Sequence, residues 1–342
     1  FRLLTGGSRT ALPRHRTLHA VVAWSWDLLS DDERLLLERL SVVPGSCTED
    51  AAEAIAGFEA RELLAALVDK SLLQPVGAGE PRYRMLETIR EYGLEQLARR
   101  AEVDTVRARH AAFFLELAEA ADRHLRTRDQ LPWLARLVVE RDNLLAALRW
   151  TIERGDGTAA TRFGAALCWF WSLQGDPPEA VDLLGRVLTV DGPAEPEGRA
   201  LVVAAHALGV AARGGSDEVE AAFGRIAPAI TGTHADGHPL LEQARMAAAI
   251  AAPDPVPDTF PADPNVRTDP WSRASGLLFR GQLARYRGDV AAATELLARA
   301  LTGFEELGER WGTATALSTL EPVLRLGGDL DGVRGMHERA TR

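Results

Sequence analysis

Apolar residues recur along this chain mainly at helical spacing, and strand-like spacing is confined to one short region. Three stretches near the start carry apolar residues three or four positions apart: residues 18–29, 31–43 and 59–73. Ser30 precedes acidic residues and Thr48 precedes an apolar run, so both are expected to cap helices. Within 68–93 an apolar patch, a Gly/Pro turn and a second apolar patch lead into another helix. This order predicts a winged helix over 17–100 with a small β-hairpin as its wing.

Beyond Gly93 the pattern is helical, without strand-like alternation. Residues 109–125 and 131–156 are predicted to form long amphipathic helices. We assign residues 101–156 to helices that link the winged helix to the C-terminal half of the chain.

A Gly-Asp pair then recurs, at Gly175-Asp176, Gly288-Asp289 and Gly328-Asp329. At the first two pairs, small and apolar residues follow at the same offsets: Ala180 and Leu184 after the first, and Ala293 and Leu297 after the second. Glycine can adopt the left-handed conformation that ends a helix, and alanine lets the next helix pack closely. The spacing predicts a tetratricopeptide-like α-solenoid over 157–342, with about four or five helix pairs.

A proline-rich segment, 253–270, interrupts the predicted solenoid and cannot be helical. We expect a surface loop between two stacks of helices. An extended strap across the concave face is the alternative. In either case the fold class is mainly α: a winged helix followed by an α-solenoid.

Composition limits the classes of partner. The formal net charge is -10 and the pI is about 5.4, which argues against a phosphate backbone as the main partner. Cys47 and Cys168 are far apart and are expected to be buried free thiols in a reducing compartment. No apolar run is long enough for a membrane span and no signal peptide is recognisable, so we expect a cytoplasmic protein without a membrane partner.

An ordered set of motifs carries a family resemblance. The series runs TLHAVVAWSWDLLSDDERLLLERLSVV, LLAALVDKSLL, YRMLETIREYG, RHAAFFLELAEAA and ERDNLLAALRW. It resembles the middle and C-terminal parts of large ATP-binding bacterial transcriptional regulators, the signal-transduction ATPases with numerous domains, which include LuxR-type and antibiotic-pathway regulators. The similarity covers nearly the whole chain and is clearest over 17–190.

The resemblance implies that other domains accompany this chain. In such regulators a P-loop nucleotide domain precedes the winged helix, which clasps it, a DNA-binding domain lies at one terminus, and the repeats receive a signal. Residues 1–16 would then be the tail of the nucleotide module, and the chain, which begins without Met, would be a fragment. No G-x-x-x-x-G-K-[ST] motif occurs in the sequence. We therefore expect no cofactor in this chain, with ATP or ADP bound only by a neighbouring domain.

One position departs from the resembled pattern. Many relatives carry a histidine near the start of the helix after the wing, where it approaches bound ADP. Leu86 stands there, between Met85 and Glu87, and a leucine cannot donate a hydrogen bond to phosphate. Nucleotide sensing at this point is in doubt, and the alternative is that Leu86 holds the helix by packing.

The charges of the winged helix do not suit a DNA-binding domain. Residues 1–100 contain about 13 basic and about 15 acidic side chains, and the candidate recognition helix is nearly balanced. The wing carries a local positive cluster, Arg82, Arg84 and Arg90. We expect these arginines to be solvated, or paired with Glu80, Glu87 and Glu91, and they are candidates for interdomain contacts. Direct DNA contact is not expected, and the winged helix is interpreted as a scaffold.

Aromatic and arginine side chains mark a candidate ligand or partner groove on the solenoid. Trp171 is predicted to pack between paired helices, whereas Trp169 or Phe170 could face the concave surface beside Arg162. A later helix would form a second wall, from Trp271, Arg280 and Tyr286. Core packing is the alternative explanation for these tryptophans.

Neither metal nor catalytic sites emerge. The pairs His15/His19 and His234/His238 have no evident third ligand, and no G-x-S-x-G motif or isolated carboxylate pair occurs. The leading interpretation is a non-enzymatic regulatory arm whose partners are the nucleotide-binding and DNA-binding domains of the same protein and an effector or protein bound by the solenoid. The alternatives are a stand-alone protein–protein adaptor with a peptide groove, and a winged-helix DNA-binding protein.

Overall fold

Two units divide the chain in the computed structural model. The winged-helix unit comprises residues 1–117 and 139–150, and the repeat unit comprises 118–138 and 151–342. The structure describes the following residues: 21–77, 79–213, 224, 226, 238–251 and 269–340. The predicted nucleotide-domain tail, 1–16, and nearly all of the proline-rich segment lie outside them.

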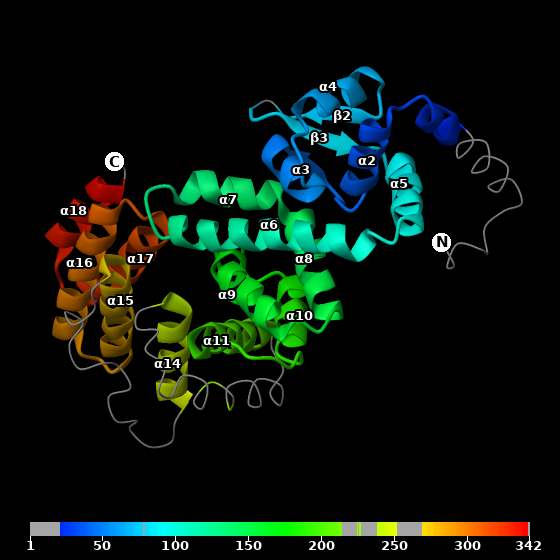
Figure 1. The fold of residues 1–342 in the computed structure, drawn as a ribbon. Coiled ribbons are helices and arrows are strands. Elements are labelled where there is room, and N and C mark those ends of the chain that lie inside the picture. The colour runs from blue at the N-terminus through cyan, green and yellow to red at the C-terminus, as the bar shows by residue number, and fades with distance from the viewer. Residues whose placement is uncertain are drawn as a thin grey trace, which may run out of the picture. The chain divides into compact units, whose positions relative to one another are not determined.

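The winged-helix unit has short helices around a small antiparallel sheet (Figure 1). A helix over 21–27 precedes these elements: α2 (Asp31–Leu40), β1 (Ser46–Thr48), α3 (Glu49–Ala56), α4 (Arg61–Asp69), β2 (Leu73–Val76), β3 (Arg82–Met85) and α5 (Glu87–Arg99). The strand order is β1-β3-β2, with Ser46 opposite Arg84 and Leu73 opposite Met85. The predicted hairpin is β2 and β3. The strand β1 was not predicted, because three residues are too few to show an alternating pattern.

Local capping sets where these helices begin. Ser30 and Glu33 form a capping box at α2, in which each side chain bonds the backbone N–H of the other residue, at 3.2 and 2.8 Å. The hydroxyl of Thr48 accepts a hydrogen bond from the N–H of Ala51 at the start of α3. Both predicted caps are confirmed.

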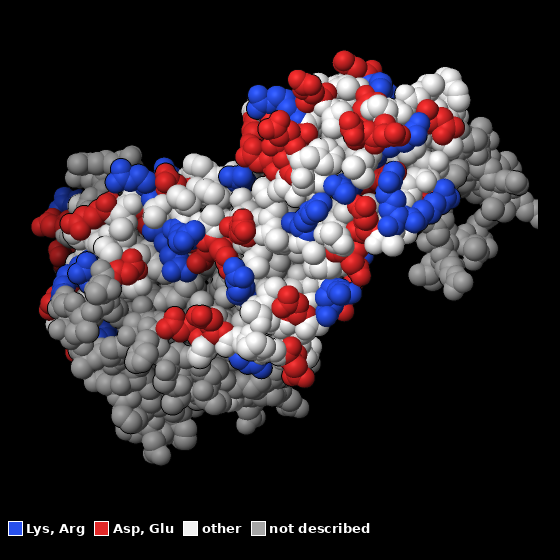
Figure 2. Space-filling model, viewed as in Figure 1, with Lys and Arg blue, Asp and Glu red and all other residues white. Residues whose placement is uncertain are grey.

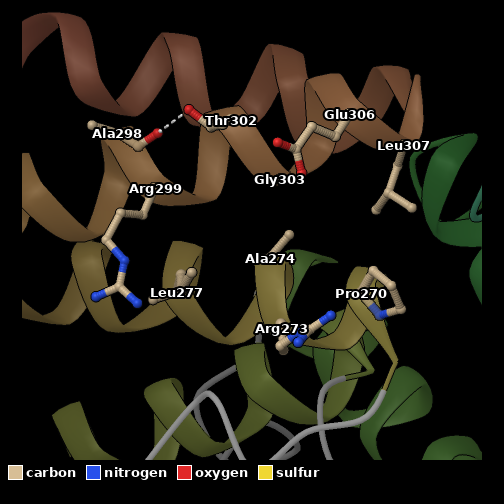
Figure 3. A pocket seen from close by; sticks show the side chains of 10 residues that line it. All are labelled: Pro270, Arg273, Ala274, Leu277, Ala298, Arg299, Thr302, Gly303, Glu306 and Leu307. Carbon is tan, nitrogen blue, oxygen red and sulfur yellow. Dashed lines mark hydrogen bonds between the residues drawn. The ribbon is translucent and has the colours of Figure 1, made fainter.

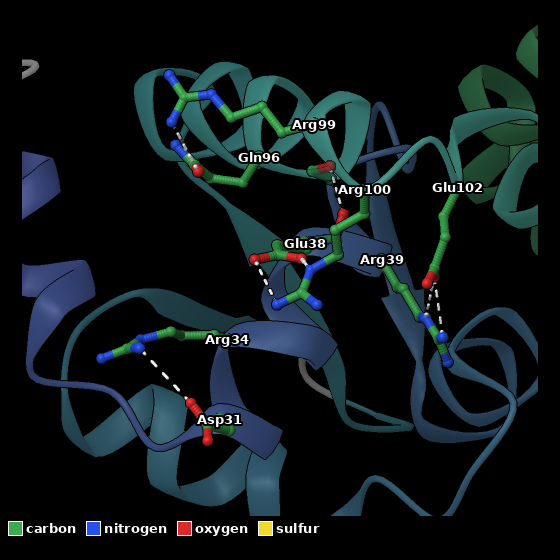
Figure 4. Close-up of polar contacts among 9 residues, drawn as sticks. Asp31, Arg34, Glu38, Arg39, Gln96, Arg99, Arg100 and Glu102 are labelled. Atoms are coloured by element: carbon green, nitrogen blue, oxygen red, sulfur yellow. Dashed lines mark hydrogen bonds and ion pairs between the residues drawn. The ribbon is translucent and has the colours of Figure 1, made fainter.

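The helices of this unit are held by an apolar core and by ion pairs at its edge. The core includes fully buried side chains from α2 to α5: Leu36, Leu37, Ile55, Leu64, Leu67 and Leu97. In Figure 4 the α2 residues Glu38 and Arg39 reach Arg100 and Glu102, which follow α5; the Arg39 Nη2–Glu102 Oε2 distance is 2.9 Å. The two ends of the winged helix are therefore tied together.

The predicted long helix over 131–156 is two helices, α7 (Gln130–Val139) and α8 (Arg141–Glu153). The break lies at Glu140, whose carbonyl accepts the first bond of α8 from the N–H of Leu144 at 2.9 Å. Its buried carboxylate accepts from Arg82 and from Asn143, which fixes the turn. Before them, α6 (Val103–His124) contributes residues up to Leu117 to the winged-helix unit and the rest to the repeat unit.

In the repeat unit, successive helices pack against their neighbours along the chain, as in an α-solenoid. The helices are α9 (Gly157–Leu173), α10 (Pro178–Val187), α11 (Pro196–Arg213), α14 (Pro239–Ala251), α15 (Pro270–Tyr286), α16 (Val290–Leu307), α17 (Arg310–Leu326) and α18 (Leu330–Ala340). The predicted fold class, a winged helix followed by an α-solenoid, is confirmed.

The glycines of the recurring Gly-Asp pairs adopt positive φ angles and end helices, as predicted. Gly288 has φ +81°, and the Asp289 carboxylate accepts from the N–H of Ala292 at 3.0 Å, so one helix ends and the next is capped within two residues. Ala293 and Leu297 are fully buried on the helix that follows. Gly155-Asp156 has the same geometry, with φ +72° and a capping bond of 3.0 Å, and was not recognised from the sequence.

Candidate functional sites

Both cations of the helix α4, which occupies the recognition position of the winged helix, are paired with carboxylates. Arg61 bonds Glu49 (Nε–Oε1 2.6 Å), and Lys70, which ends the helix, bonds Glu33 (Nζ–Oε1 2.5 Å). The pairing lowers the pKa of the Glu33 carboxyl through its bond to Lys70. Glu62 and Asp69 remain exposed on α4. Figure 2 shows acidic side chains gathered over the winged-helix unit, where α3 and α4 lie in Figure 1.

The three arginines that the sequence assigned to the wing have three different environments, and one of them, Arg90, lies on α5 and not on the wing. Arg82 lies inside the winged-helix unit: it bonds the Glu140 carboxylate at 2.6 Å, and the Ser46 hydroxyl and carbonyl at 3.0 and 2.9 Å. Its partner is therefore Glu140 and not the expected Glu80. Arg90 bonds Glu87 on the same helix, one of the pairings expected from the sequence. Arg84 is exposed.

Leu86 is the N-cap residue of α5, and its side chain makes no capping hydrogen bond. The side chain is 44% exposed, and packing of the helix through Leu86 stays a prediction. A leucine side chain has no hydrogen-bond donor, and the absence of nucleotide sensing at this position stays a prediction.

The first helix of the winged-helix unit has two apolar faces. Val22, Trp26 and Leu29 are buried, and Trp26 contacts the ring of Tyr92 edge to face at 5.0 Å. Away from this buried face, Val21 and Trp24 of the helix and Leu28, in the turn that follows it, form an exposed stripe at i, i+3 and i+7. Trp24 is 67% exposed, which is unusual for so large an apolar side chain. Periodicity alone could not show which face would be covered, because both are apolar.

The repeat unit brings Trp169 and Trp271 together instead of placing them on two walls. Their ring centroids are 5.7 Å apart, and the rings are 1% and 2% exposed. Trp311 and His238 join them, at 4.7 and 5.8 Å from Trp169, and form the aromatic cluster of this unit. Burial lowers the pKa of His238, with a smaller contribution from a nearby arginine, Arg126. These tryptophans therefore build the core and not an open groove.

The remaining predicted groove residues are separated. Phe170 is buried, and Tyr286 is 65% exposed at the end of α15. Arg162 bonds Glu119 through both its Nε and Nη2 atoms, at 2.7 and 2.8 Å, beside a cavity of about 360 Å³ that several carboxylates line. Arg280 is half-buried in the middle of α15. The aromatic–arginine groove proposed from the sequence is not assembled.

A different groove opens between α15 and α16 (Figure 3). Its cavity measures about 680 Å³, within the range of about 300–1,000 Å³ found for small-molecule sites. It is lined from both helices by Pro270, Arg273, Ala274, Leu277, Ala298, Arg299, Thr302, Gly303, Glu306 and Leu307. The sequence could not locate it, since it depends on how α15 and α16 pack against each other.

Within the described residues, no three His, Cys, Asp or Glu side chains gather as a metal site would require, and no helix is long and apolar enough to cross a bilayer. His15, His19 and His234 lie outside these residues. Cys47 and Cys168 are free and buried, as expected, and burial raises the pKa of the Cys47 thiol to about 12.

Comparison with known proteins supports the assignment of the first unit as a winged helix. Residues 29–98 match the winged helix-turn-helix domain family. Proteins of Mycobacterium tuberculosis and Mycobacterium bovis that carry the name HTH-type transcriptional regulator are 38% identical over 178 residues, 50% of this chain and 20% of theirs. An uncharacterized protein of Mycobacterium tuberculosis is also 38% identical, over 118 residues, 32% of this chain and 30% of that protein.

Among solved structures, a signal transduction ATPase with numerous domains from Pyrococcus horikoshii, which has a tetratricopeptide repeat sensor, aligns with a TM-score of 0.49 and 13% identity. The alignment covers 92% of this chain and 50% of that one. This likeness is too loose to establish a shared fold. The chain spans about a fifth of the length of the regulators it matches, and it contains a winged helix-turn-helix domain.

Proposed function

We propose that this chain is the non-catalytic regulatory arm of a multidomain, cytoplasmic bacterial transcriptional regulator. In this proposal the winged helix docks on a nucleotide-binding domain of the same protein, which holds ATP or ADP, and another domain binds DNA. The repeat unit receives an effector or a protein partner. The relatives that are named transcriptional regulators support a role in regulation.

The exposed stripe of Val21, Trp24 and Leu28 is the observation that carries the docking role. An apolar stripe of this kind on a soluble unit marks a surface that a partner covers. The same unit offers little to DNA, because the cations of α4 are neutralised by Glu49 and Glu33. A winged helix whose apolar stripe is open and whose recognition helix has both cations paired with carboxylates suits a protein partner better than a phosphate backbone.

Regulation would follow from differential binding. A ligand that favours one arrangement of the repeat helices shifts the equilibrium between docked and released states of the neighbouring domain. The size of the shift is limited by the difference in ligand affinity between the two states.

Copurification tests the docking role. The chain is co-expressed with the nucleotide-binding domain of the same protein, and Trp24→Asp with Leu28→Asp should abolish copurification by placing charges in an apolar interface. Leu326→Asp, at a leucine of the repeat unit that is 74% exposed, is the matched control and should leave copurification intact. Copurification that survives both aspartates would contradict the proposal, as would salt-sensitive binding of duplex DNA by the chain.

A further inference from the structure

The groove between α15 and α16 combines a narrow apolar floor with charged walls. Ala274 and Leu277 on α15 are buried, and Gly303 faces them from α16. A Cβ added to Gly303 would lie 3.1 Å from the Cβ of Ala274, so the two helices approach closely at this point. The floor is therefore continuous and apolar, and it can contact the hydrocarbon part of a ligand.

Two arginines line the same cavity, one from each helix (Figure 3). Arg273 is half-buried on α15 and forms no ion pair with a carboxylate of the described part of the chain. Arg299 extends from α16 toward α15, and its contact with Glu295 is long, at 3.5 Å between two exposed side chains. Such a contact is weak, so both guanidinium groups keep most of their capacity to bind an anion.

Glu306 is the opposing charge in the groove, and it does not cancel two arginines. In a chain with a formal net charge of -10, a cavity with a positive balance stands out from its surroundings. The apolar floor and the positive walls together match one class of ligand, an amphipathic organic anion.

We infer that the α15–α16 groove binds a small organic anion with an apolar body. Its carboxylate or other anionic group lies at the guanidinium groups of Arg273 and Arg299, and its hydrocarbon part lies on Ala274 and Leu277. The inference deepens the proposed signal-receiving role, on which its biological meaning rests, by naming the chemical class of the ligand. Binding itself is a property of this chain and can be measured without the neighbouring domains.

Calorimetric titration of the whole chain with decanoate tests the inference, with decylammonium as the probe of opposite charge. Decanoate should bind saturably and decylammonium should not. Arg273→Gln and Arg299→Gln should each weaken decanoate binding about tenfold, because each removes a charge-assisted hydrogen bond. Glu306→Gln should strengthen binding about two- to threefold, because it removes a repulsive charge.

Two further variants test whether decanoate binds in the groove or to any positively charged surface. Arg285→Gln removes the same charge from the same helix outside the groove, and it should leave binding unchanged. Ala298→Phe keeps both arginines but places a ring in the cavity, and it should abolish binding while the thermal unfolding of the chain stays cooperative. Equal binding of decanoate and decylammonium would overturn the inference, as would wild-type affinity in both arginine variants.

An acidic peptide provides the last comparison. A peptide that binds with an affinity sensitive to Arg273→Gln, while decanoate does not bind, would overturn the assignment to a small anion and favour a protein partner. That result would leave the docking of the winged helix untouched, since docking is read out by Trp24→Asp. The two proposals can therefore fail separately.

Discussion

The ion pair between Arg82 and Glu140 is the clearest buried charge in the winged-helix unit. The exposed fractions of the two side chains are 11% and 3%, and Asn143 also donates to the carboxylate at 2.7 Å. Arg82→Leu leaves this carboxylate buried without its cation, so we expect a loss of about 3 kcal/mol in the free energy of unfolding. Urea denaturation followed by circular dichroism measures it.

The control for this prediction is the more exposed pair of Arg90 and Glu87 on the same unit, whose side chains are 21% and 63% exposed. Arg90→Leu removes the cation from Glu87, which is mostly exposed, and should cost less than about 1 kcal/mol. Adding Glu140→Gln to Arg82→Leu should recover part of the loss, because the buried charge is then gone. Equal losses for Arg82→Leu and Arg90→Leu would show that burial does not set the strength of the pair.

We expect His110 to make the stability of the winged-helix unit depend on pH. Burial, with a smaller contribution from Arg107, lowers its pKa from 6.5 to about 4. Between these values the unfolded chain binds a proton that the folded chain does not, so stability is complete above pH 6.5 and falls as the pH drops toward 4. The loss should reach about 2 kcal/mol at pH 5.

His110→Leu removes the titrating group and should abolish that part of the acid destabilisation. Urea unfolding of both proteins at pH 7.5 and pH 5 measures the difference. A variant that loses as much stability as the wild-type chain between these pH values would exclude His110 as the source.

The roles of residues whose partners are close in the sequence could be predicted. The roles of residues whose partners are distant in the sequence could not. Ser30 and Thr48 bond backbone groups three positions away, so their capping roles follow from local order. Glu140 meets Arg82 across 58 positions, and no local pattern reveals the pair. Trp169 and Trp271 were recognised as notable, but only the packing of the repeat unit brings them together.

At the scale of elements, close contact between α16 and α17 depends on Gly312. A Cβ at this position would lie 2.3 Å from the Phe304 ring, which is fully buried and cannot move freely. Gly312→Ala should therefore destabilise the repeat unit by about 1–3 kcal/mol, despite the better helix propensity of alanine. Thermal and urea unfolding measure the effect.

Gly198 in α11 is the matched control. An added Cβ there meets its nearest atoms at 3.7 Å, which is ordinary van der Waals contact. Gly198→Ala should be neutral or stabilise the chain by up to about 1 kcal/mol, because alanine restricts the unfolded state. A similar loss in both variants would mean that the contact with Phe304 is not decisive.

Elements with a repeated local signal were predictable, and elements defined by tertiary pairing were not. Glycines at positive φ recur along the chain at Gly175, Gly288 and Gly328, and they disclosed the helix pairs. The strand β1 exists because it pairs with β3, and the break between α7 and α8 is fixed by a side chain bonded to the sheet. The α15–α16 groove likewise depends on the tertiary packing of two helices.

At the scale of the whole molecule, the formal net charge of -10 and three exposed carboxylates lead to a prediction about DNA; Glu59 lies just before α4, and Glu62 and Asp69 lie on it. If the winged-helix shape is intact and only its charge excludes DNA, reversing charges at α4 should create affinity. The variant Glu59→Lys, Glu62→Lys and Asp69→Lys should bind duplex DNA without sequence preference, whereas the wild-type chain should not. With about three phosphate contacts, the logarithm of the binding constant should fall with the logarithm of salt concentration with a slope near -2 to -3.

A variant with the same net charge but different placement provides the control. Asp182→Lys, Glu295→Lys and Asp331→Lys reverse three exposed carboxylates of the repeat unit. It should bind DNA far more weakly in an electrophoretic shift titration at several salt concentrations, because its lysines are not gathered on a helix that fits the major groove. Equal binding by both variants would mean that total charge matters and the winged-helix shape does not. No binding by the α4 variant would mean that the shape itself has lost its fit to DNA, and the unit would then be a docking module in geometry as well as in charge.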